Sequence, residues 1–355
     1  MRSLLSPKIT RRAFTGGLTA AVSLPALVGC GDKKSQIRVY NWDTYIGPTT
    51  LEDFTKATGT EVRYDLFADN AELFAKLREG NPGYDVIVPS NDTVERMIRA
   101  DMLVALDRTK IPNFANLEPA FQDAAFDKGR KYTMPYFWGT VGIGYRKSKV
   151  PTPPTSWASI FDNPSMKGRI SVLGEPAQLV GIAAKYLGYS INVRDPEQIA
   201  AAEKLLIKAK PTFLTIAGDD GQDRLLRGEV DLCMEHSGDI LQVMKEDPDL
   251  GFALPKEGGL LWQDCLAIPK GAPNVAAAHD FINFILRPDV HAAIAATIRY
   301  PLPNAAAKKL MSADYLNDSA IYPPADALAK SETQTYPGEA TQRLYDETLT
   351  RLRAA

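Results

Sequence analysis

The first hundred residues alternate between the hydrophobic spacing of strands and that of helices. Residues 37–42 form a short apolar run typical of a buried strand, and residues 61–67 alternate in the manner of a half-buried one. Between them, apolar side chains recur at helical spacing from Thr50, which we expect to cap a helix, to Gly59, which ends it. This segment therefore predicts a strand, a helix and a second strand.

The same alternation continues downstream. Asn70 is expected to cap a second helix, and residues 84–88 again have the pattern of a strand. A β-α-β-α-β order requires a parallel sheet with helices on its faces, and ligands of such sheets gather at the carboxyl ends of the strands. We therefore expect residues 42–45 and 90–92, which follow two of these strands, to face a common crevice.

A second α/β unit follows the proline-rich turn at residues 150–154. Residues 169–173 predict a strand and residues 177–186 a helix, and Asp195 with Pro196 predicts the start of another helix. Since the chain is longer than the roughly 150 residues of one typical domain, we expect two α/β lobes.

Two further strands are expected near residues 230–235 and 260–268. The second of them is interrupted by Gln263 and Asp264, and two polar residues inside an apolar run need a partner or a function. The chain is expected to end in a helix over residues 340–352.

The N-terminus has the features of an export signal. Residues 1–29 contain four basic residues, no acidic residue and an apolar stretch too short to remain in a bilayer as a helix. The paired Arg11 and Arg12 are typical of a twin-arginine signal. Leu27-Val28-Gly29-Cys30 resembles a bacterial lipobox, in which the cysteine thiol carries a diacylglyceryl group. We expect a periplasmic protein tethered to a membrane by lipidated Cys30; the alternative is an ordinary secretory signal.

Charge and composition exclude several classes of function. The chain has 41 Lys and Arg against 43 Asp and Glu, and without the signal segment its net charge is about −6, which argues against a nucleic-acid partner. His236, His279 and His291 form no metal-ligand pattern with the cysteines, so we expect no metal and no cofactor. Cys233 and Cys265 are able to pair in an oxidising compartment, but the sequence does not place them within bonding distance.

An enzyme is the rival class of function. Its nearest hints are acidic residues at strand ends and the turn Gly218-Asp219-Asp220, which could in principle hold a metal. The sequence shows no Ser-His-Asp order and no phosphate-cradling glycine loop, and Asp219 is most simply a helix cap. We therefore expect a protein that is not an enzyme.

Aromatic and acidic residues collect at the predicted strand ends. The aromatic residues are Trp42, Tyr45, Trp262 and Tyr300, and the acids are Asp43, Asp92, Glu175, Asp239 and Asp264. Methylene groups stack on rings, ammonium ions are attracted to aromatic faces, and a carboxylate adds a charge-assisted hydrogen bond worth roughly 1.5–3 kcal/mol. The combination suits an organic cation. Each residue also has a structural interpretation, such as Asp239 as a first-turn helix acid and Asp92 as a helix cap.

A series of short motifs resembles the spermidine/putrescine-binding periplasmic proteins. The motifs stand in the family's order and at similar spacing, and they cover essentially all of the chain after the signal segment. They are Tyr40-Asn41-Trp42-Asp43-Thr44-Tyr45, Val88-Pro89-Ser90, Pro135-Tyr136-Phe137-Trp138-Gly139-Thr140, Thr155-Ser156-Trp157, Pro255-Lys256-Glu257-Gly258-Gly259, Trp262-Gln263-Asp264, Leu286-Arg287-Pro288-Asp289 and Tyr300-Pro301-Leu302-Pro303-Asn304.

The resemblance implies the α/β fold of a type II periplasmic binding protein, in which two lobes are joined by two hinge crossover strands. The crossovers would lie near residues 138–141 and 262–264. The first lobe would comprise residues 36–140 and 263–308, and the second lobe residues 141–262 and 309–355. The implied function is that of a monomeric protein that captures putrescine or spermidine between its lobes and delivers it to the permease subunits of an ABC transporter.

The resemblance also implies which residues bind the ligand. Asp264 would pair with an amine, Asp239 matches an aspartate of putrescine binders, and Glu175 matches an acid of spermidine binders. The complete implied set is Trp42, Asp43, Tyr45, Ser90, Glu175, His236, Asp239, Trp262, Asp264 and Tyr300.

Three positions depart from the family's pattern. Thr44 and Gln178 stand where relatives place acidic residues, and His236 stands where they place tryptophan. The choice between putrescine, spermidine and another small organic cation therefore stays open. A sensor subunit that presents ligand occupancy to a membrane receptor is a further alternative.

Overall fold

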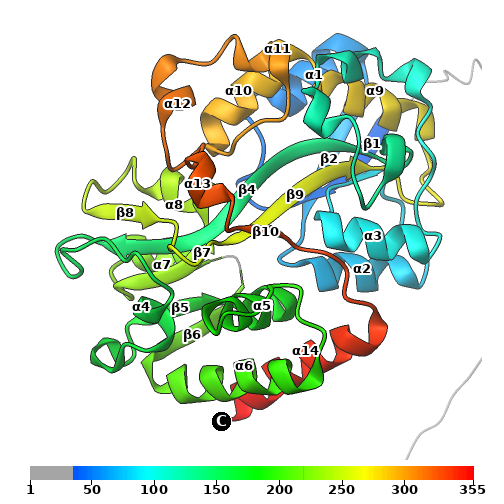
Figure 1. Cartoon of the computed structure of the whole chain (residues 1–355). Coiled ribbons are helices and arrows are strands. Elements are labelled where there is room, and N and C mark those ends of the chain that lie inside the picture. The colour runs from blue at the N-terminus through cyan, green and yellow to red at the C-terminus, as the bar shows by residue number, and fades with distance from the viewer. Residues whose placement is uncertain (1–34, 219) are drawn as a thin grey trace, which may run out of the picture. The chain divides into compact units, whose positions relative to one another are not determined.

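The computed structural model describes residues 35–218 and 220–355. The predicted signal segment, Cys30 and Asp219 lie outside these ranges. Within them, one ten-stranded sheet is covered by helices (Figure 1). The strands are β1 (Gln36–Asn41), β2 (Glu61–Leu66), β3 (Val86–Ile87), β4 (Thr133–Arg146), β5 (Ile170–Leu173), β6 (Phe213–Ala217), β7 (Leu232–His236), β8 (Leu250–Ala253), β9 (Leu260–Ala267) and β10 (Glu332–Thr333).

The helices that connect these strands vary from one turn to more than four. They are α1 (Thr50–Thr58), α2 (Asn70–Arg78), α3 (Asn91–Arg99), α4 (Ala158–Phe161), α5 (Pro176–Tyr186), α6 (Pro196–Ala209), α7 (Gly221–Leu226), α8 (Ser237–Val243), α9 (Val275–Ile285), α10 (Pro288–Ile298), α11 (Ala305–Lys308), α12 (Ala313–Asn317), α13 (Ala325–Leu328) and α14 (Glu339–Ala354). Short 3-10 helices lie between α3 and β5, among them η1 (Arg108–Lys110) and η2 (Pro112–Asn116). One more follows α6.

The N-terminal part of the described chain has the predicted β-α-β-α-β order. Strand β1 pairs in parallel with β2 on one side and with β3 on the other. Gly59 takes the left-handed conformation that ends α1, as expected. The predicted caps were wrong by one residue, because the N-cap of α1 is Thr49 and that of α2 is Asp69, whose side chain accepts a hydrogen bond from the Glu72 amide.

Two long strands in the middle of the sheet join its two parallel groups. The strand order is β2-β1-β3-β9-β4-β7-β5-β6, with β1, β2 and β3 parallel on one side and β5, β6 and β7 parallel on the other. Strands β4 and β9 run antiparallel, and their register places Trp138 opposite Gln263 and Gly139 opposite Trp262. The expected architecture of two α/β lobes linked by two crossover strands is therefore confirmed.

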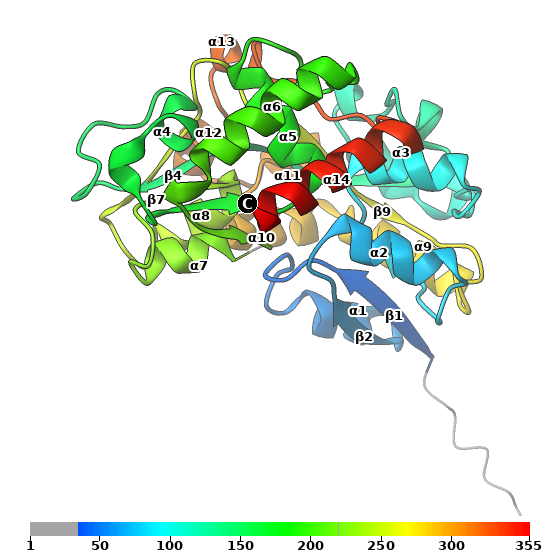
Figure 2. The ribbon, with the colours of Figure 1, turned by 90° about the horizontal axis from the view of Figure 1, so that it is seen from below.

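The second parallel group is completed by the C-terminus of the chain. The Asp195 side chain caps α6 by accepting hydrogen bonds from the amides of Glu197 and Gln198, as the sequence predicts. Helix α14 packs against α5 and α6 (Figure 2). Its buried side chains include Tyr345, Leu349 and Leu352. Helix α14, which has sixteen residues, is therefore part of the core of this group.

The segment that leads into α14 contacts both groups of elements. β10 adds a parallel strand beside β9. On one side, Asn91 Nδ2 donates to the Gln334 carbonyl at 2.5 Å, and Arg96 forms an ion pair with Glu339. On the other side, Lys185 Nζ lies 2.6 Å from Glu332 Oε1. This segment is consequently a third connection between the two groups, besides β4 and β9.

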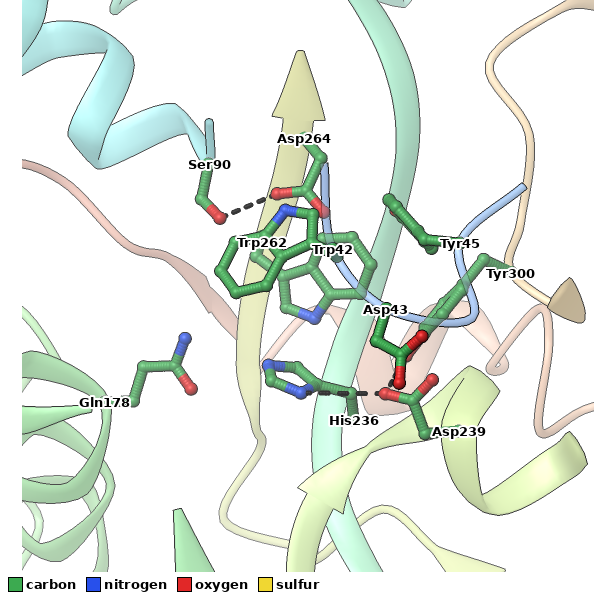
Figure 3. A pocket seen from close by; sticks show the side chains of 10 residues that line it. All are labelled: Trp42, Asp43, Tyr45, Ser90, Gln178, His236, Asp239, Trp262, Asp264 and Tyr300. Atoms are coloured by element: carbon green, nitrogen blue, oxygen red, sulfur yellow. Dashed lines mark hydrogen bonds and ion pairs between the residues drawn. The ribbon is translucent and has the colours of Figure 1, made fainter. Parts of the chain in front are cut away.

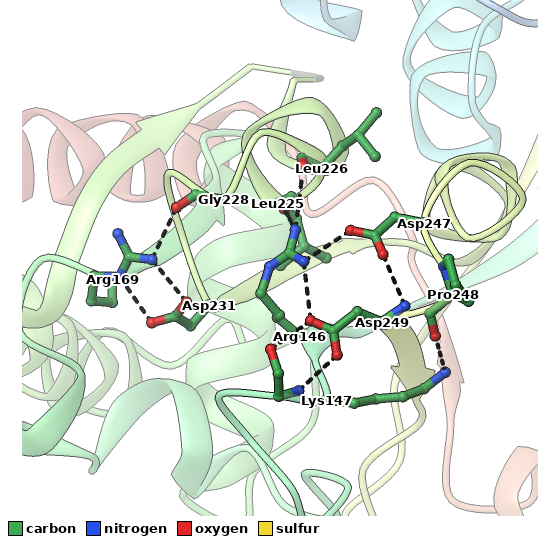
Figure 4. Close-up of polar contacts among 11 residues, drawn as sticks. Arg146, Lys147, Arg169, Leu225, Leu226, Gly228, Asp231, Asp247, Pro248 and Asp249 are labelled. Carbon is green, nitrogen blue, oxygen red and sulfur yellow. Dashed lines mark hydrogen bonds and ion pairs between the residues drawn. The ribbon is translucent and has the colours of Figure 1, made fainter.

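An arginine network closes the far end of β4 (Figure 4). Arg146 Nη1 lies 2.8 Å from Asp247 Oδ2 and 3.1 Å from Asp249 Oδ2. Its Nη2 donates to the carbonyls of Leu225 and Leu226 at the C-terminus of α7. A cation at this position satisfies carbonyls that have no partner inside the helix and complements the negative end of the helix dipole. One side chain thus ties β4 to α7 and to the turn before β8.

Two smaller findings complete the description. Cys233 and Cys265 are both free and buried, so no disulfide joins them. In the described part of the chain, no single helix has the length and hydrophobicity needed to cross a bilayer. Only α9 and α10 meet these criteria as a pair, and the chain bends by 72° between them.

Candidate ligand-binding site

A cavity lies where the carboxyl ends of β1 and β3 meet β9 and the start of α8 (Figure 3). The residues that line it are Trp42, Asp43, Tyr45, Ser90, Gln178, His236, Asp239, Trp262, Asp264 and Tyr300. The structure therefore brings together nine of the ten residues that the sequence nominated, and it adds Gln178.

Loops, helices and strands carry these side chains to the cavity: the turn after β1, the start of α3, helices α5 and α8, the end of β7, strand β9 and the segment after α10. The turn after β1 supplies Trp42, Asp43 and Tyr45, and the bend at Thr44, whose φ is 49°, directs Asp43 toward the cavity in place of Thr44. Ser90 is the N-cap of α3, directly after β3. The expectation that the segments after two neighbouring strands meet at one crevice is confirmed for these residues.

Alternation along β9 explains the polar interruption of this apolar strand. Trp262 and Asp264 both line the cavity, as side chains two residues apart in a strand share one face. Gln263 is also buried, and its Oε1 accepts a hydrogen bond from Arg130 Nη2 at 2.6 Å. Each polar residue of the run therefore has a partner.

Asp264 is a buried carboxylate at the centre of the site. Its Oδ1 accepts a hydrogen bond from the Ser90 hydroxyl at 2.6 Å, and the Ser90 hydroxyl in turn accepts from Asn70 Nδ2 at 3.1 Å. Burial raises the pKa of the Asp264 carboxyl to about 7, although the hydrogen bond from Ser90 opposes this shift. A cation placed beside Asp264 would lower the pKa again, because it stabilises the ionised form.

A cage of aromatic rings surrounds this acid. The rings of Trp262 and Tyr300 meet edge to face with centroids 5.0 Å apart, and those of Tyr45 and Tyr300 at 5.5 Å. Trp42 is held by a hydrogen bond from its Nε1 to the Val88 carbonyl at 2.9 Å. Aromatic faces attract ammonium groups and pack well against methylene chains, so the cage suits an alkyl cation.

A second acid, Asp239, faces the cavity from the first turn of α8. The Tyr300 hydroxyl donates to its Oδ2 at 2.7 Å. His236 Nδ1 lies 3.1 Å from Glu235 Oε1 and 3.9 Å from Asp239 Oδ2. Each of Glu235, His236 and Asp239 offers one possible metal-ligand atom, and these atoms all lie within 4.8 Å of one another. These three residues are the ones here that could hold a metal ion. The expectation of no metal and no cofactor stays a prediction.

Glu175 lies in an adjoining cavity and not in the one described above. This second cavity shares Trp42, Gln178 and His236 with the first, and it is also lined by Asp69 and Arg353. Burial raises the pKa of Glu175 to about 8, and the nearby carboxylates of Asp92 and Asp69 raise it further.

Three residues weighed in the sequence analysis have structural roles. Asp92 does not line the cavity, and its Oδ2 accepts a hydrogen bond from Gln334 Nε2 at 3.2 Å. His291 is buried with its Nε2 2.8 Å from the Tyr136 carbonyl, and burial lowers its pKa to about 4. His279 Nε2 accepts a hydrogen bond from the Asp107 amide. Neither of these two histidines lines the cavity.

Gln178 and Arg353 were not nominated as site residues. Gln178 had been noted only as a departure from an acidic position, although it follows Glu175 by three residues and so lies one helical turn away from it. Arg353 belongs to the last turn of α14, and no local pattern relates the end of the chain to the strand ends.

Comparisons with known proteins show the family to which the chain belongs. The family model described as "Bacterial extracellular solute-binding protein" matches residues 49–323. The spermidine/putrescine-binding periplasmic protein of Escherichia coli (strain K12) is 37% identical over 336 residues, covering 94% of this chain and 96% of that protein. The putrescine-binding periplasmic protein SpuD of Pseudomonas aeruginosa is 35% identical, covering 95% of this chain and 96% of its own length.

Solved structures show the same similarity. A putative spermidine/putrescine ABC transporter protein from Listeria monocytogenes superimposes with a TM-score of 0.86 at 33% identity, covering 90% of this chain and 99% of that one. The family binds substrates for transport and is not a family of enzymes, so the expected absence of enzymatic activity is confirmed. The chain belongs to the bacterial extracellular solute-binding proteins and, within them, resembles the polyamine binders throughout its length.

Proposed function

We propose that this chain captures a small polyamine, putrescine or spermidine, in the cavity around Asp264 and delivers it to the permease subunits of an ABC importer. The observation that carries the proposal is a buried carboxylate inside a cage of aromatic rings, with a second carboxylate, Asp239, facing the same space. The names of the similar proteins from E. coli and P. aeruginosa support it.

Capture would be coupled to closure of the two lobes. We place the first lobe at residues 36–140 and 263–308 and the second at residues 141–262 and 309–355. A ligand that contacts Asp264 in one lobe and Asp239 in the other has a higher affinity for the closed form, and this difference drives closure. Micromolar capture corresponds to about 8 kcal/mol, which charge-assisted hydrogen bonds and aromatic burial together can supply after ordering costs.

The proposed location is the periplasm. Homologous proteins are periplasmic, and the paired arginines at positions 11 and 12 favour export by the twin-arginine route. Lipidation of Cys30 would hold the protein at a membrane, near the permease that it serves. We expect it to act as a monomer there.

Isothermal titration of the ligand-free protein tests the proposed ligand. Putrescine and spermidine are expected to bind with micromolar or tighter affinity, and glutamate and glucose are expected to bind at least a hundredfold more weakly. Tighter binding of glutamate or glucose than of either amine would contradict the proposal.

A transport assay separates an importer subunit from a sensor subunit. Cells that lack this chain should lose uptake of labelled putrescine or spermidine, and the intact chain should restore it. Normal uptake together with the loss of a transcriptional response to the amine would support the sensor alternative.

A further inference from the structure

The cavity has two chemically different ends. Asp43 and Asp239 lie on one side with Tyr300, whereas Gln178 reaches in from the opposite side, with His236 between them (Figure 3). The first end offers carboxylates to an ammonium group. The second end combines carboxyl groups with the Gln178 amide, the N-terminus of α5 and the guanidinium group of Arg353.

The Gln178 side chain is built into the wall of the cavity and is only 6% exposed. Its Oε1 is buried and has no hydrogen-bond partner among the described residues. A primary amide carries both an acceptor and two donors, so it is satisfied best by a group that also donates and accepts. Since buried polar groups are nearly always hydrogen-bonded, this amide indicates a ligand group at this end.

The start of α5 adds further donors at the same place. Leu173, Gly174, Glu175 and Gln178, which lead into the helix and form its first turn, line the adjoining cavity. Glu175 is the N-cap of this eleven-residue helix, and its side chain makes no capping hydrogen bond. Amides of a first helical turn lack partners inside the helix, and the helix dipole makes this end positive. Such an end attracts a hydrogen-bond acceptor.

Charged groups of both signs surround this end of the cavity. Arg353 lines the adjoining cavity and carries a permanent positive charge. Glu175 has its pKa raised to about 8, chiefly by burial and also by the carboxylates of Asp92 and Asp69, so its carboxyl is mostly protonated at neutral pH when no cation lies beside it. Asp69 also lines this cavity, but its Oδ1 is occupied as the cap of α2 by the Glu72 amide at 2.7 Å.

We propose that the preferred ligand is a mono-N-acylated diamine, with its ammonium group at Asp264 and Asp239 and its acyl amide at Gln178 and the start of α5. This inference rests on the proposed function, since it places a modified amine in the same cavity. The amide N–H of the ligand donates to Gln178 Oε1, and its carbonyl accepts from Gln178 Nε2 or from the first-turn amides of α5. A free diamine carries only donors, so its second ammonium group could satisfy Gln178 Oε1 but would leave Gln178 Nε2 and the first-turn amides of α5 without an acceptor.

A titration series with the ligand-free protein at pH 7.5 tests the assignment. The probes are putrescine, N-acetylputrescine, N,N′-diacetylputrescine and 4-aminobutanoate. N-acetylputrescine is expected to bind at least as tightly as putrescine, and the diacetylated compound, which has no ammonium group, at least a hundredfold more weakly. The inference is overturned if putrescine binds more than tenfold tighter than N-acetylputrescine. It is also overturned if 4-aminobutanoate binds tightest, since this would assign the second end to a carboxylate beside Arg353.

The substitution Gln178→Glu tests the residue itself. It replaces a donor and acceptor by a carboxylate of the same shape, so it should weaken N-acetylputrescine binding at least tenfold and leave or improve binding of putrescine. Gln36→Glu, at the exposed start of β1, adds the same charge away from the cavity and should change neither affinity by more than twofold. Equal changes for both ligands in Gln178→Glu would contradict the inference.

Different results would contradict the proposed function and the proposed acylated ligand. If none of these amines and no spermidine binds, the proposed function is wrong. If putrescine and spermidine bind but acetylation of one nitrogen abolishes binding, only the inference about Gln178 is wrong. Circular dichroism and thermal melting of both variants confirm that the comparison is made on folded protein.

Discussion

The Ser90 hydroxyl donates a 2.6 Å hydrogen bond to Asp264 Oδ1, although the two residues lie 174 positions apart in the chain. Ser90 is itself fixed by Asn70, whose Nδ2 donates to the Ser90 hydroxyl. The carboxylate at the centre of the cavity is therefore oriented before any ligand arrives. Preorganised acceptors of this kind reduce the ordering cost of binding.

Replacement of Asp264 by asparagine should remove most of the affinity for an amine. The change keeps the shape of the side chain and removes its charge, and loss of one partner of a desolvated charge pair costs about 2–5 kcal/mol, or tens to thousands of fold in affinity. Isothermal titration measures this loss. The melting temperature of the ligand-free variant should be unchanged or higher, because a buried carboxylate has been removed.

The matched control for this prediction is Asp43→Asn. Asp43 lines the same cavity but is exposed, so its charge is screened by water and the loss of affinity should be smaller. Amine binding by Asp264→Asn within a factor of two of the parent would show that the assigned cavity is wrong.

Affinity for an amine should rise with pH between 6 and 8. Burial raises the pKa of Asp264 to about 7, so the carboxyl is mostly protonated at pH 6 and mostly ionised at pH 8, which changes the affinity about tenfold if ionisation is required for binding. Titrations at several pH values measure the slope, which should be much smaller in Asp264→Asn. An affinity that is constant over this range in the parent would contradict the requirement.

The same pKa shift has the opposite effect on the ligand-free protein. The native state holds the Asp264 proton more tightly than the unfolded chain does, since the ordinary pKa is 3.8. The contribution of this group to stability is therefore fully present below about pH 4 and is lost as the pH rises to about 7. The difference in unfolding free energy between the parent and Asp264→Asn, followed with pH, isolates this contribution.

Removal of the Arg146 side chain should destabilise the protein without changing the site. Arg146 contacts Asp247, Asp249 and two carbonyls of α7, and hydrogen bonds to a charged group contribute about 1.5–3 kcal/mol each at most. Arg146→Ala should lower the unfolding free energy by roughly 1–3 kcal/mol and leave amine affinity within about threefold. The neighbouring Lys147 makes one exposed hydrogen bond to the Pro248 carbonyl, so Lys147→Ala should have little effect on chemical denaturation.

The membrane tether depends on one thiol in the proposed signal. Cys30→Ser removes the acceptor of the diacylglyceryl group, so metabolic labelling with a fatty acid should disappear and the protein should no longer fractionate with membranes. Immunoblotting of membrane and soluble fractions checks the location. Unchanged lipid labelling of the variant would exclude Cys30 as the attachment site and favour an ordinary secretory signal.

The sequence predicted the elements that have strong local signals. The strand-helix order from β1 to β3 was readable because apolar periodicity, Gly59 and the polar caps agree within short windows. β6 and β8 were not predicted, since they are short and owe their pairing to β5 and β4, which are distant in the chain. The caps were misplaced by one residue because Thr49 and Thr50 are chemically alike, and only backbone geometry separates them.

The sequence predicted those cavity residues that carry distinctive chemical groups and also lie at the ends of strands or within a strand. Trp42, Ser90 and Asp264 carry recognisable groups at strand ends or within a strand, and the family resemblance placed them together. Gln178 has an uncharged side chain, and its importance follows from burial and the lack of a partner, which only the structure gives. Arg353 reaches the site through the packing of α14 against α5, a contact between distant parts of the chain.

The placement of α14 has a consequence for biosynthesis. The surfaces of α5 and α6 that receive Tyr345 and Leu352 are translated well before those side chains exist. The second parallel group therefore cannot acquire its complete core before α14 has been translated, even though domains often fold in order from the N-terminus during synthesis. Until α14 is made, the nascent chain exposes on α5 and α6 an apolar surface that a chaperone is able to recognise.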